Sequence, residues 1–120
     1  MVKRYFLQYG AQNVAVDELG QRIASLLGMQ TQQRDTLYAG GYIKCSGPTA
    51  DYLTIESDKE GDGTPKHETE PLSSYQVFVD VSNIHGKNID KEARNAAIKH
   101  AFSTIPELVL LKETLLEQER

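Results

Sequence analysis

Few residues in this sequence have the chemistry of an active site. The one cysteine, Cys45, stands in an apolar, alternating segment, and no neighbour supplies the electropositive setting that a reactive thiolate needs. The three histidines, His67, His85 and His100, are not at metal-ligand spacing from one another or from the cysteine. We therefore expect a buried structural cysteine and solvated or partly packed histidines, with no catalytic residue and no metal ligand.

Two acidic patterns are further chemical candidates. Segment 58–63 (DKEGDG) resembles the opening of a calcium-binding loop, but its twelfth position is Thr69, where such loops need a bidentate glutamate. Glu56 and Asp80 are predicted to share the outer face of a sheet, where paired carboxylates can act as general acid and base. Solvent-facing acids are common on strands, so we expect neither a metal nor a cofactor.

Composition and charge restrict the class of protein. The 120 residues are enough for one domain, 1–120, and 39% of them are apolar. A single cysteine excludes an internal disulfide, which is typical of a reducing compartment. The net charge of −4 argues against nucleic-acid binding and suits a basic protein partner. We find no signal-peptide core and no run of membrane-spanning length, so we expect a cytoplasmic protein that does not bind membranes.

Hydrophobic periodicity predicts the elements that position these residues. Alternation predicts strands over residues 2–9, 35–45, 51–57 and 74–82, with a bend at Gly40-Gly41. Helical spacing predicts a helix over 17–27, followed by Gly28. A second helix is expected from an Asp90 cap through Phe102, with Ile98 and three alanines packing inward, namely Ala93, Ala97 and Ala101.

The last segment is predicted to be a third helix. Residues 104–107 (TIPE) fit a capping box with proline early in the helix, and Leu108, Leu111 and Leu115 would form its apolar stripe. The predicted fold is therefore α+β, with an antiparallel sheet of about four strands, helices on one face, and the order β-α-β-β-β-α-α. The polar, acidic stretch 57–73 is expected to be a mobile loop.

Alternation also assigns the strand side chains to two faces of the sheet. One face is apolar, and the other carries Tyr42, Tyr52 and Phe78 beside the acids Glu56 and Asp80 and the lysine Lys44. Tyrosine is enriched at protein interfaces, and acidic side chains speed the encounter with a basic partner. We therefore expect this face and the neighbouring loop to bind a protein through Tyr42, Tyr52, Glu56, Asp58, Glu60, Asp62, Glu68, Glu70, Phe78 and Asp80.

Three segments carry a resemblance to a known class of proteins: DELGQRIASLLG at 17–28, YAGGY at 38–42 and DYLTIE at 51–56. With them, the chain resembles the small immunity proteins of bacterial polymorphic-toxin and contact-dependent growth inhibition systems. The resemblance implies a cytoplasmic protein without catalytic activity. It implies tight binding to a cognate toxin domain, often a nuclease, whose active site is masked. It assigns no functional residue.

Two other functions fit the same residues. The chain could be a small-ligand-binding protein or small enzyme with a pocket between sheet and helices, holding Cys45, His100 or the Glu56–Asp80 pair. It could instead be a homodimeric structural or regulatory subunit that assembles through the outer sheet face or the C-terminal helix. The expected oligomeric state is accordingly a monomer or a homodimer.

Overall fold

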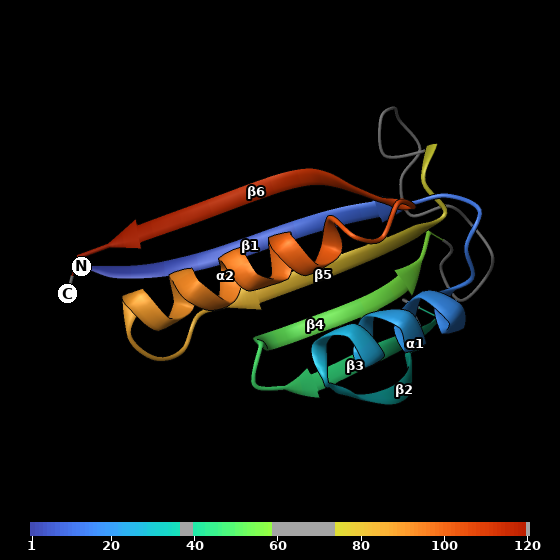
Figure 1. Ribbon diagram of the computed structural model, residues 1–120, viewed down its shortest axis with the longest axis horizontal. Coiled ribbons are helices and arrows are strands. Elements are labelled where there is room, and N and C mark those ends of the chain that lie inside the picture. Colours follow the sequence, from blue (N-terminus) through green and yellow to red (C-terminus); the bar gives the residue numbers. More distant parts are fainter. Residues whose placement is uncertain (37–39, 59–73, 120) are drawn as a thin grey trace.

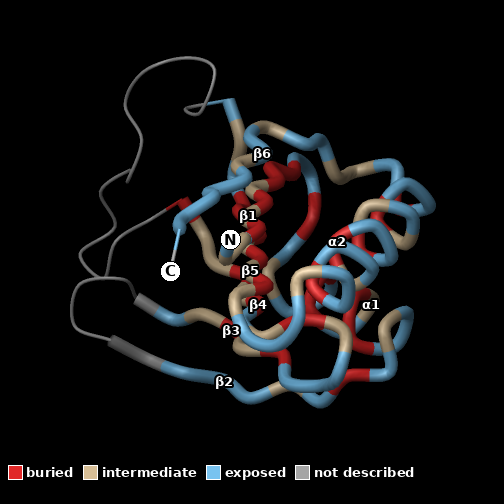
Figure 2. Tube along the Cα trace, turned by 90° about the vertical axis from the view of Figure 1, so that its left-hand side faces the viewer, coloured by how far each residue is buried: buried red, intermediate tan, exposed pale blue. Residues whose placement is uncertain are grey.

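The computed structural model describes residues 1–36, 40–58 and 74–119. Within them the chain forms one antiparallel six-stranded sheet with two helices on the same face (Figures 1 and 2). The strand order across the sheet is β2-β3-β4-β5-β1-β6. In chain order the elements are β1 Val2–Ala11, α1 Val16–Leu27, β2 Gln30–Thr36, β3 Gly40–Gly47, β4 Ala50–Ser57, β5 Val77–Asn83, α2 Asn88–Phe102 and β6 Leu108–Gln118.

The α+β class is confirmed, but the predicted strand number and element order are wrong. The structure has six strands, not about four, in the order β-α-β-β-β-β-α-β. The first cause is β2, whose sequence QTQQRDT contains no apolar residue and therefore shows no alternation. The stretch predicted as one strand over 35–45 is divided between β2 and β3, so Gly40 begins a strand where we expected a bend.

The second cause is the last segment, which is strand β6 rather than a helix. Its leucines fit either period, and pairing with β1 from Val2↔Gln118 to Ala11↔Leu108 decides the outcome. The expected capping box is a turn after α2, in which Thr104 Oγ1 donates to the Ala101 carbonyl at 2.7 Å.

The topology contains two split β-α-β units. Without the hairpin of β2 and β3, the chain runs β1-α1-β4-β5-α2-β6, and β5 lies between β1 and β4 while β1 lies between β5 and β6. This is the β-α-β-β-α-β arrangement of ferredoxin-like domains. The hairpin extends the sheet beyond β4 (Figure 1). Such an arrangement hosts many unrelated functions, so it assigns none by itself.

The core lies between the sheet and the two helices. Leu19 and Ile23 of α1 and Ile98 and Phe102 of α2 pack on alternate strand residues, which are buried (Figure 2). Phe102 meets Tyr9 of β1 edge to face, with ring centroids 4.9 Å apart. Glycine is a poor helix former, but packing explains its presence at position 20 of α1. A Cβ there would lie 2.8 Å from Cδ1 of Ile43, so glycine lets α1 approach β3 closely.

Helix α2 buries Ile98 and packs Ala101 partly buried against the core, as predicted, but the rest of its inward face differs from the alanine pattern. Its buried residues are Lys91, Asn95, Ile98 and Phe102, whereas Ala93 and Ala97 are exposed. The helix begins at Asn88, two residues before the expected cap, and Asp90 lies in its first turn. Alanine is tolerated equally in both environments, so its spacing did not determine the orientation of this helix.

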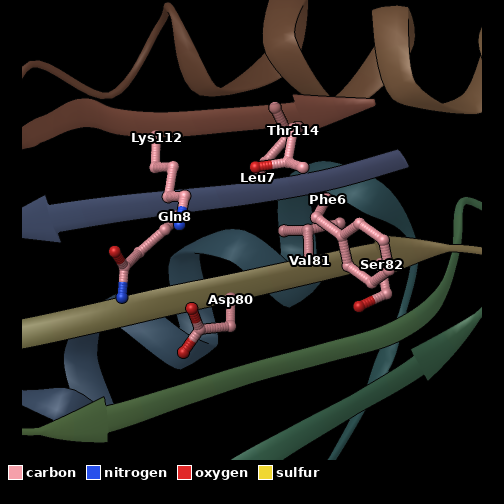
Figure 3. Close-up of a pocket in the computed structure, with 8 residues that line it drawn as sticks. All are labelled: Phe6, Leu7, Gln8, Asp80, Val81, Ser82, Lys112 and Thr114. Atoms are coloured by element: carbon pink, nitrogen blue, oxygen red, sulfur yellow. The ribbon is translucent and has the colours of Figure 1, made fainter. Parts of the chain in front are cut away.

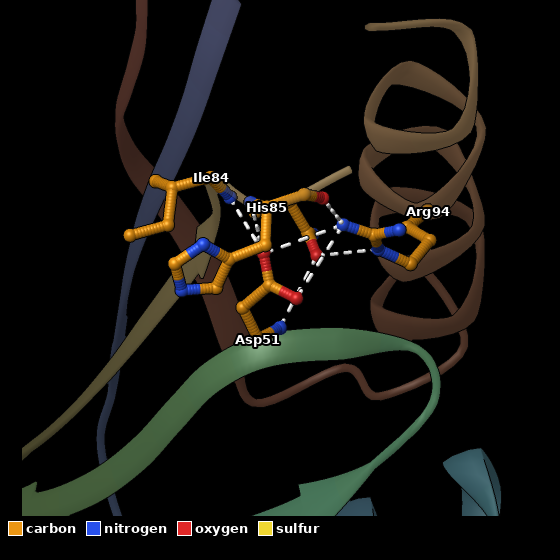
Figure 4. A network of polar contacts seen from close by, with 5 residues as sticks. Asp51, Ile84, His85 and Arg94 are labelled. Carbon is orange, nitrogen blue, oxygen red and sulfur yellow. Dashed lines mark hydrogen bonds and ion pairs between the residues drawn. The ribbon is translucent and has the colours of Figure 1, made fainter. Parts of the chain in front are cut away.

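A polar network joins the start of β4 to the connection between β5 and α2 (Figure 4). Asp51 Oδ2 accepts hydrogen bonds from the backbone N–H groups of Ile84 and His85, both at 2.7 Å. Arg94 Nη2 lies 3.3 Å from the same carboxylate, and Arg94 Nε donates to Asn83 Oδ1 at 2.9 Å. The network therefore fixes the direction in which the chain leaves β5 and enters α2.

The pKa of Asp51 is shifted by this network. Burial raises it, but the hydrogen bonds from His85 and Ile84 and the charge of Arg94 outweigh burial, so the pKa lies below its ordinary value. A carboxyl whose folded pKa is lowered stabilises the folded state fully above its unfolded pKa of about 3.9. That contribution is lost as the pH falls through the lower folded pKa.

We expect Asp51→Asn to lower the free energy of unfolding at pH 7 by about 1–3 kcal/mol, because a charged acceptor of several hydrogen bonds is lost. Urea denaturation followed by circular dichroism measures the difference. It should begin to shrink below the unfolded pKa of about 3.9, where the unfolded carboxyl takes up a proton, and should vanish once the pH has fallen through the lower folded pKa of Asp51. Glu92→Gln, exposed on α2, serves as the control. An equal loss at pH 7 and pH 2 would contradict the charge-based account.

Candidate protein-binding surface

The face of the sheet opposite the helices, here called the helix-free face, is a surface of alternate strand residues. The pairing registers place Lys44, Thr54, Asp80, Gln8 and Lys112 in one row across five strands. A neighbouring row contains Tyr52, Ser82, Phe6 and Thr114, and a third contains Tyr42, Glu56 and Phe78. The side chains between these rows point to the helices and form the core.

A hollow of about 320 Å³ lies on this face over β5, β1 and β6 (Figure 3). Its polar groups are the Asp80 carboxylate, the Lys112 ammonium, the Gln8 amide and the Ser82 and Thr114 hydroxyls, beside the ring of Phe6 and the strand residues Leu7 and Val81. Such a lining offers both charges, hydrogen-bond donors and acceptors, and one aromatic contact. It can accept a polar side chain or a short peptide segment of a partner.

The structure brings together the strand residues that sequence analysis selected. Tyr42, Tyr52, Glu56 and Asp80 all lie on the helix-free face. Tyr52 is the most accessible of the aromatic residues there, with 45% of its surface exposed, and its ring centroid lies 6.1 Å from that of His85. Tyr42 is half-buried. The face therefore carries an exposed aromatic side chain surrounded by polar ones.

Two of the selected residues lie in different surroundings from those expected. Phe78 is on the helix-free face but is fully buried, with the ring of Tyr75 packed edge to face against it at 6.4 Å. Tyr75 also crosses Gly10, where a Cβ would lie 2.6 Å from its ring. Asp58 is buried, and its N–H donates to the Gln76 carbonyl at 2.8 Å. Neither side chain is available to a partner in this structure.

The remaining selected acids, Glu60, Asp62, Glu68 and Glu70, lie outside the described residues, as does nearly all of the expected acidic loop. The candidate calcium segment 58–63 also lies outside them apart from Asp58.

The helix-free face is less acidic than sequence analysis predicted. Glu56 and Asp80 share it with Lys44 and Lys112. Alternation had already placed Lys44 outward, but Lys112 was missed because its segment was assigned to a helix. The surface has charges of both signs, so a complementary partner with a net positive charge would still need acidic groups opposite Lys44 and Lys112.

The other chemical candidates do not gather into a site. Cys45 of β3 is buried in the core, and burial raises the pKa of its thiol to about 11. His100 is exposed on α2, and His67 lies outside the described residues. Among the residues that the structure describes, no three His, Cys, Asp or Glu side chains are placed to hold a metal ion. The polar core residues Lys91 and Asn83, both fully buried, were not anticipated from the sequence.

Comparison with known proteins adds no assignment to this geometry. No protein-family model matches the chain, and no curated protein matches it. Neither helix in the described part of the chain is long and apolar enough to cross a membrane.

We expect Cys45 to be inert toward a thiol reagent such as Ellman's reagent in the folded protein at pH 8 and to react fully in urea. Only the thiolate is nucleophilic, and both the burial and the raised pKa suppress it. The absorbance of the released thiolate measures the rate. Ser25→Cys, exposed on α1, is the control and should react at once. Fast labelling of wild-type protein would restore Cys45 as a candidate nucleophile.

Proposed function

We propose that this domain is a non-catalytic, cytoplasmic protein-binding module that neutralises a cognate bacterial toxin domain, such as a nuclease, by masking its active site. The observation that carries the proposal is the helix-free face, where Tyr52 is accessible among half-buried aromatic and charged side chains. Aromatic side chains within a polar surrounding are typical of specific protein interfaces. The resemblance of segments 17–28, 38–42 and 51–56 to immunity proteins supplies the class of partner.

The chemistry of the face suggests how such a partner would bind. Tyr52 would serve as the anchor, because a tyrosine combines a large contact area with a hydrogen-bonding hydroxyl. The adjacent hollow would accept a side chain of the toxin, with Asp80 and Lys112 selecting its charge. The net charge of −4 would speed encounter with a basic nuclease.

The geometry gives less support to a ligand-binding or catalytic pocket between the sheet and the helices. That space is filled by core side chains, and Cys45 is buried within it. His100, the other candidate for such a pocket, is exposed on the surface of α2. The hollow at Asp80 lies on the opposite face of the sheet.

We expect the tagged chain to capture one protein in stoichiometric amount from its native host. That protein should stop growth when produced alone and should be neutralised when the chain is produced with it. Tyr52→Ala should weaken the purified complex at least about tenfold in calorimetry, because interface tyrosines often contribute 2 kcal/mol or more. Ile89→Ala, an exposed apolar residue on α2, is the matched control.

Two outcomes would contradict the proposal. Unchanged affinity of Tyr52→Ala would exclude the helix-free face as the binding site. A captured partner that does not inhibit growth would exclude toxin neutralisation, even if Tyr52 were needed for binding.

A basic partner predicts a further effect. Lys44→Glu replaces a positive charge of β3 on the helix-free face with a negative one, so it should raise the association rate constant several-fold at low salt. Stopped-flow mixing at about 20 and 300 mM salt measures the rate, and the gain should shrink at the higher salt because charges are then screened. A slower association of Lys44→Glu would indicate an acidic partner.

A further inference from the structure

The two edges of the sheet are very different. Strand β2 forms one edge and β6 the other. Within the described part of the chain, β6 pairs only with β1, and the backbone groups on its outer side have no partner apart from a turn hydrogen bond at Leu108. An edge strand with free N–H and C=O groups is a template for pairing with another strand. β6 is also long, with eleven residues.

The β6 edge exposes large apolar side chains on both faces of the sheet, beside the exposed charges of Lys112, Glu113 and Glu117. Leu110 and Leu115 lie opposite Tyr9 and Tyr5 on the helix side, whereas Val109 and Leu116 lie opposite Gly10 and Arg4 on the helix-free side. These four side chains are 40–49% exposed. Monomeric proteins normally protect an edge with charges, proline or a short strand.

The opposite edge shows such protection. β2 has the sequence QTQQRDT, and its residues Gln30, Gln32, Gln33 and Arg34 are exposed polar side chains. β2 has no apolar side chain to expose, whereas β6 exposes four large ones, so β6 is the edge that gains more from being covered.

The sequence of β6 indicates what covers it. In the segment 110–116, LLKETLL, two leucine pairs flank a polar triplet, so the segment is nearly the same in both directions. A bulge leaves Leu111 outside the register with β1, because Gln8 pairs with Lys112 and Tyr9 with Leu110. An antiparallel copy of this strand, centred on Glu113 and with Leu111 again outside the register, would place Leu110 against Leu115 on the helix side and Val109 against Leu116 on the helix-free side. An unrelated partner strand would not require this symmetry. A two-fold axis perpendicular to the sheet brings two copies together in this way.

The central residue of the segment would face its own copy in such a pair. Like charges directly opposite on neighbouring strands are destabilising. Here the cost is reduced, because Lys99 of α2 holds the Glu113 carboxylate through contacts of 3.0 and 3.1 Å in the same chain. In each copy, the Lys99 ammonium thus offsets the negative charge of the Glu113 that lies at the two-fold axis.

We propose that β6 pairs antiparallel with β6 of a second copy of this chain, centred on Glu113, so that one sheet continues through both copies. The contact uses the edge and leaves the helix-free face uncovered. It is therefore independent of the proposed toxin binding, and either can hold without the other.

Sedimentation equilibrium from about 1 to 100 µM tests the proposal. Wild-type protein should form a closed dimer. Leu115→Lys should raise the dimer dissociation constant roughly a hundredfold, because symmetry introduces the change twice. Leu26→Lys on α1 is the matched control, since both leucines are 45% exposed. Circular dichroism checks that each variant folds.

A cross-link tests the register. In a Glu113→Cys variant the two-fold axis brings the new thiols together, so bismaleimidoethane should yield a covalent dimer, while the buried Cys45 leaves wild-type protein uncross-linked. Ser25→Cys should give none. The proposal is overturned by a monomer at every concentration, by a dimer that Leu115→Lys leaves intact, by growth beyond two copies, or by a dimer without the Glu113→Cys cross-link.

Discussion

The pairing of β1 with two neighbours is the constraint on which the rest of the structure depends. β1 hydrogen-bonds to β5 on one side and to β6 on the other, and its side chains alternate between the two faces of the sheet. Leu7 and Tyr9 enter the core under the helices, while Phe6 and Gln8 reach the helix-free face. A shift of one residue in either register would exchange these sets, so the core and the candidate binding surface are specified together.

The parts of the fold that could be predicted are those where one period dominates. β1, β4, β5 and α1 have a clear apolar alternation or stripe, and each was located within a few residues. β2 could not be predicted, because its sequence is wholly polar and therefore lacks the alternation of apolar and polar residues that indicates a half-buried strand. β6 was assigned to the wrong class because leucines at 108, 111 and 115 fit a helix as well as a strand, and only the register with β1 separates them.

The candidate surface shows the same limits. Alternation alone placed Tyr42, Tyr52, Glu56 and Asp80 on one face, which the registers reproduce. It could not reveal that Phe78 is covered, because Tyr75 was predicted to continue the strand over 74–82, whereas it precedes β5 and packs its ring against Phe78. The basic character that Lys112 adds to this face was also hidden, since it depends on the class assigned to a distant strand. Local patterns thus predict the direction of a side chain better than its accessibility.

The polar β2 strand has a consequence for how large any assembly of this domain can become. A domain whose two sheet edges can both pair with further copies behaves like a bifunctional monomer in polymer chemistry and grows into fibres. A domain with only one such edge can pair with only one other copy. When the hairpin of β2 and β3 extends the sheet beyond β4, it places glutamines and an arginine at the far end. If two copies pair through β6 as proposed, the joined sheet therefore ends in a polar β2 strand on both sides, and this limits the assembly to two copies.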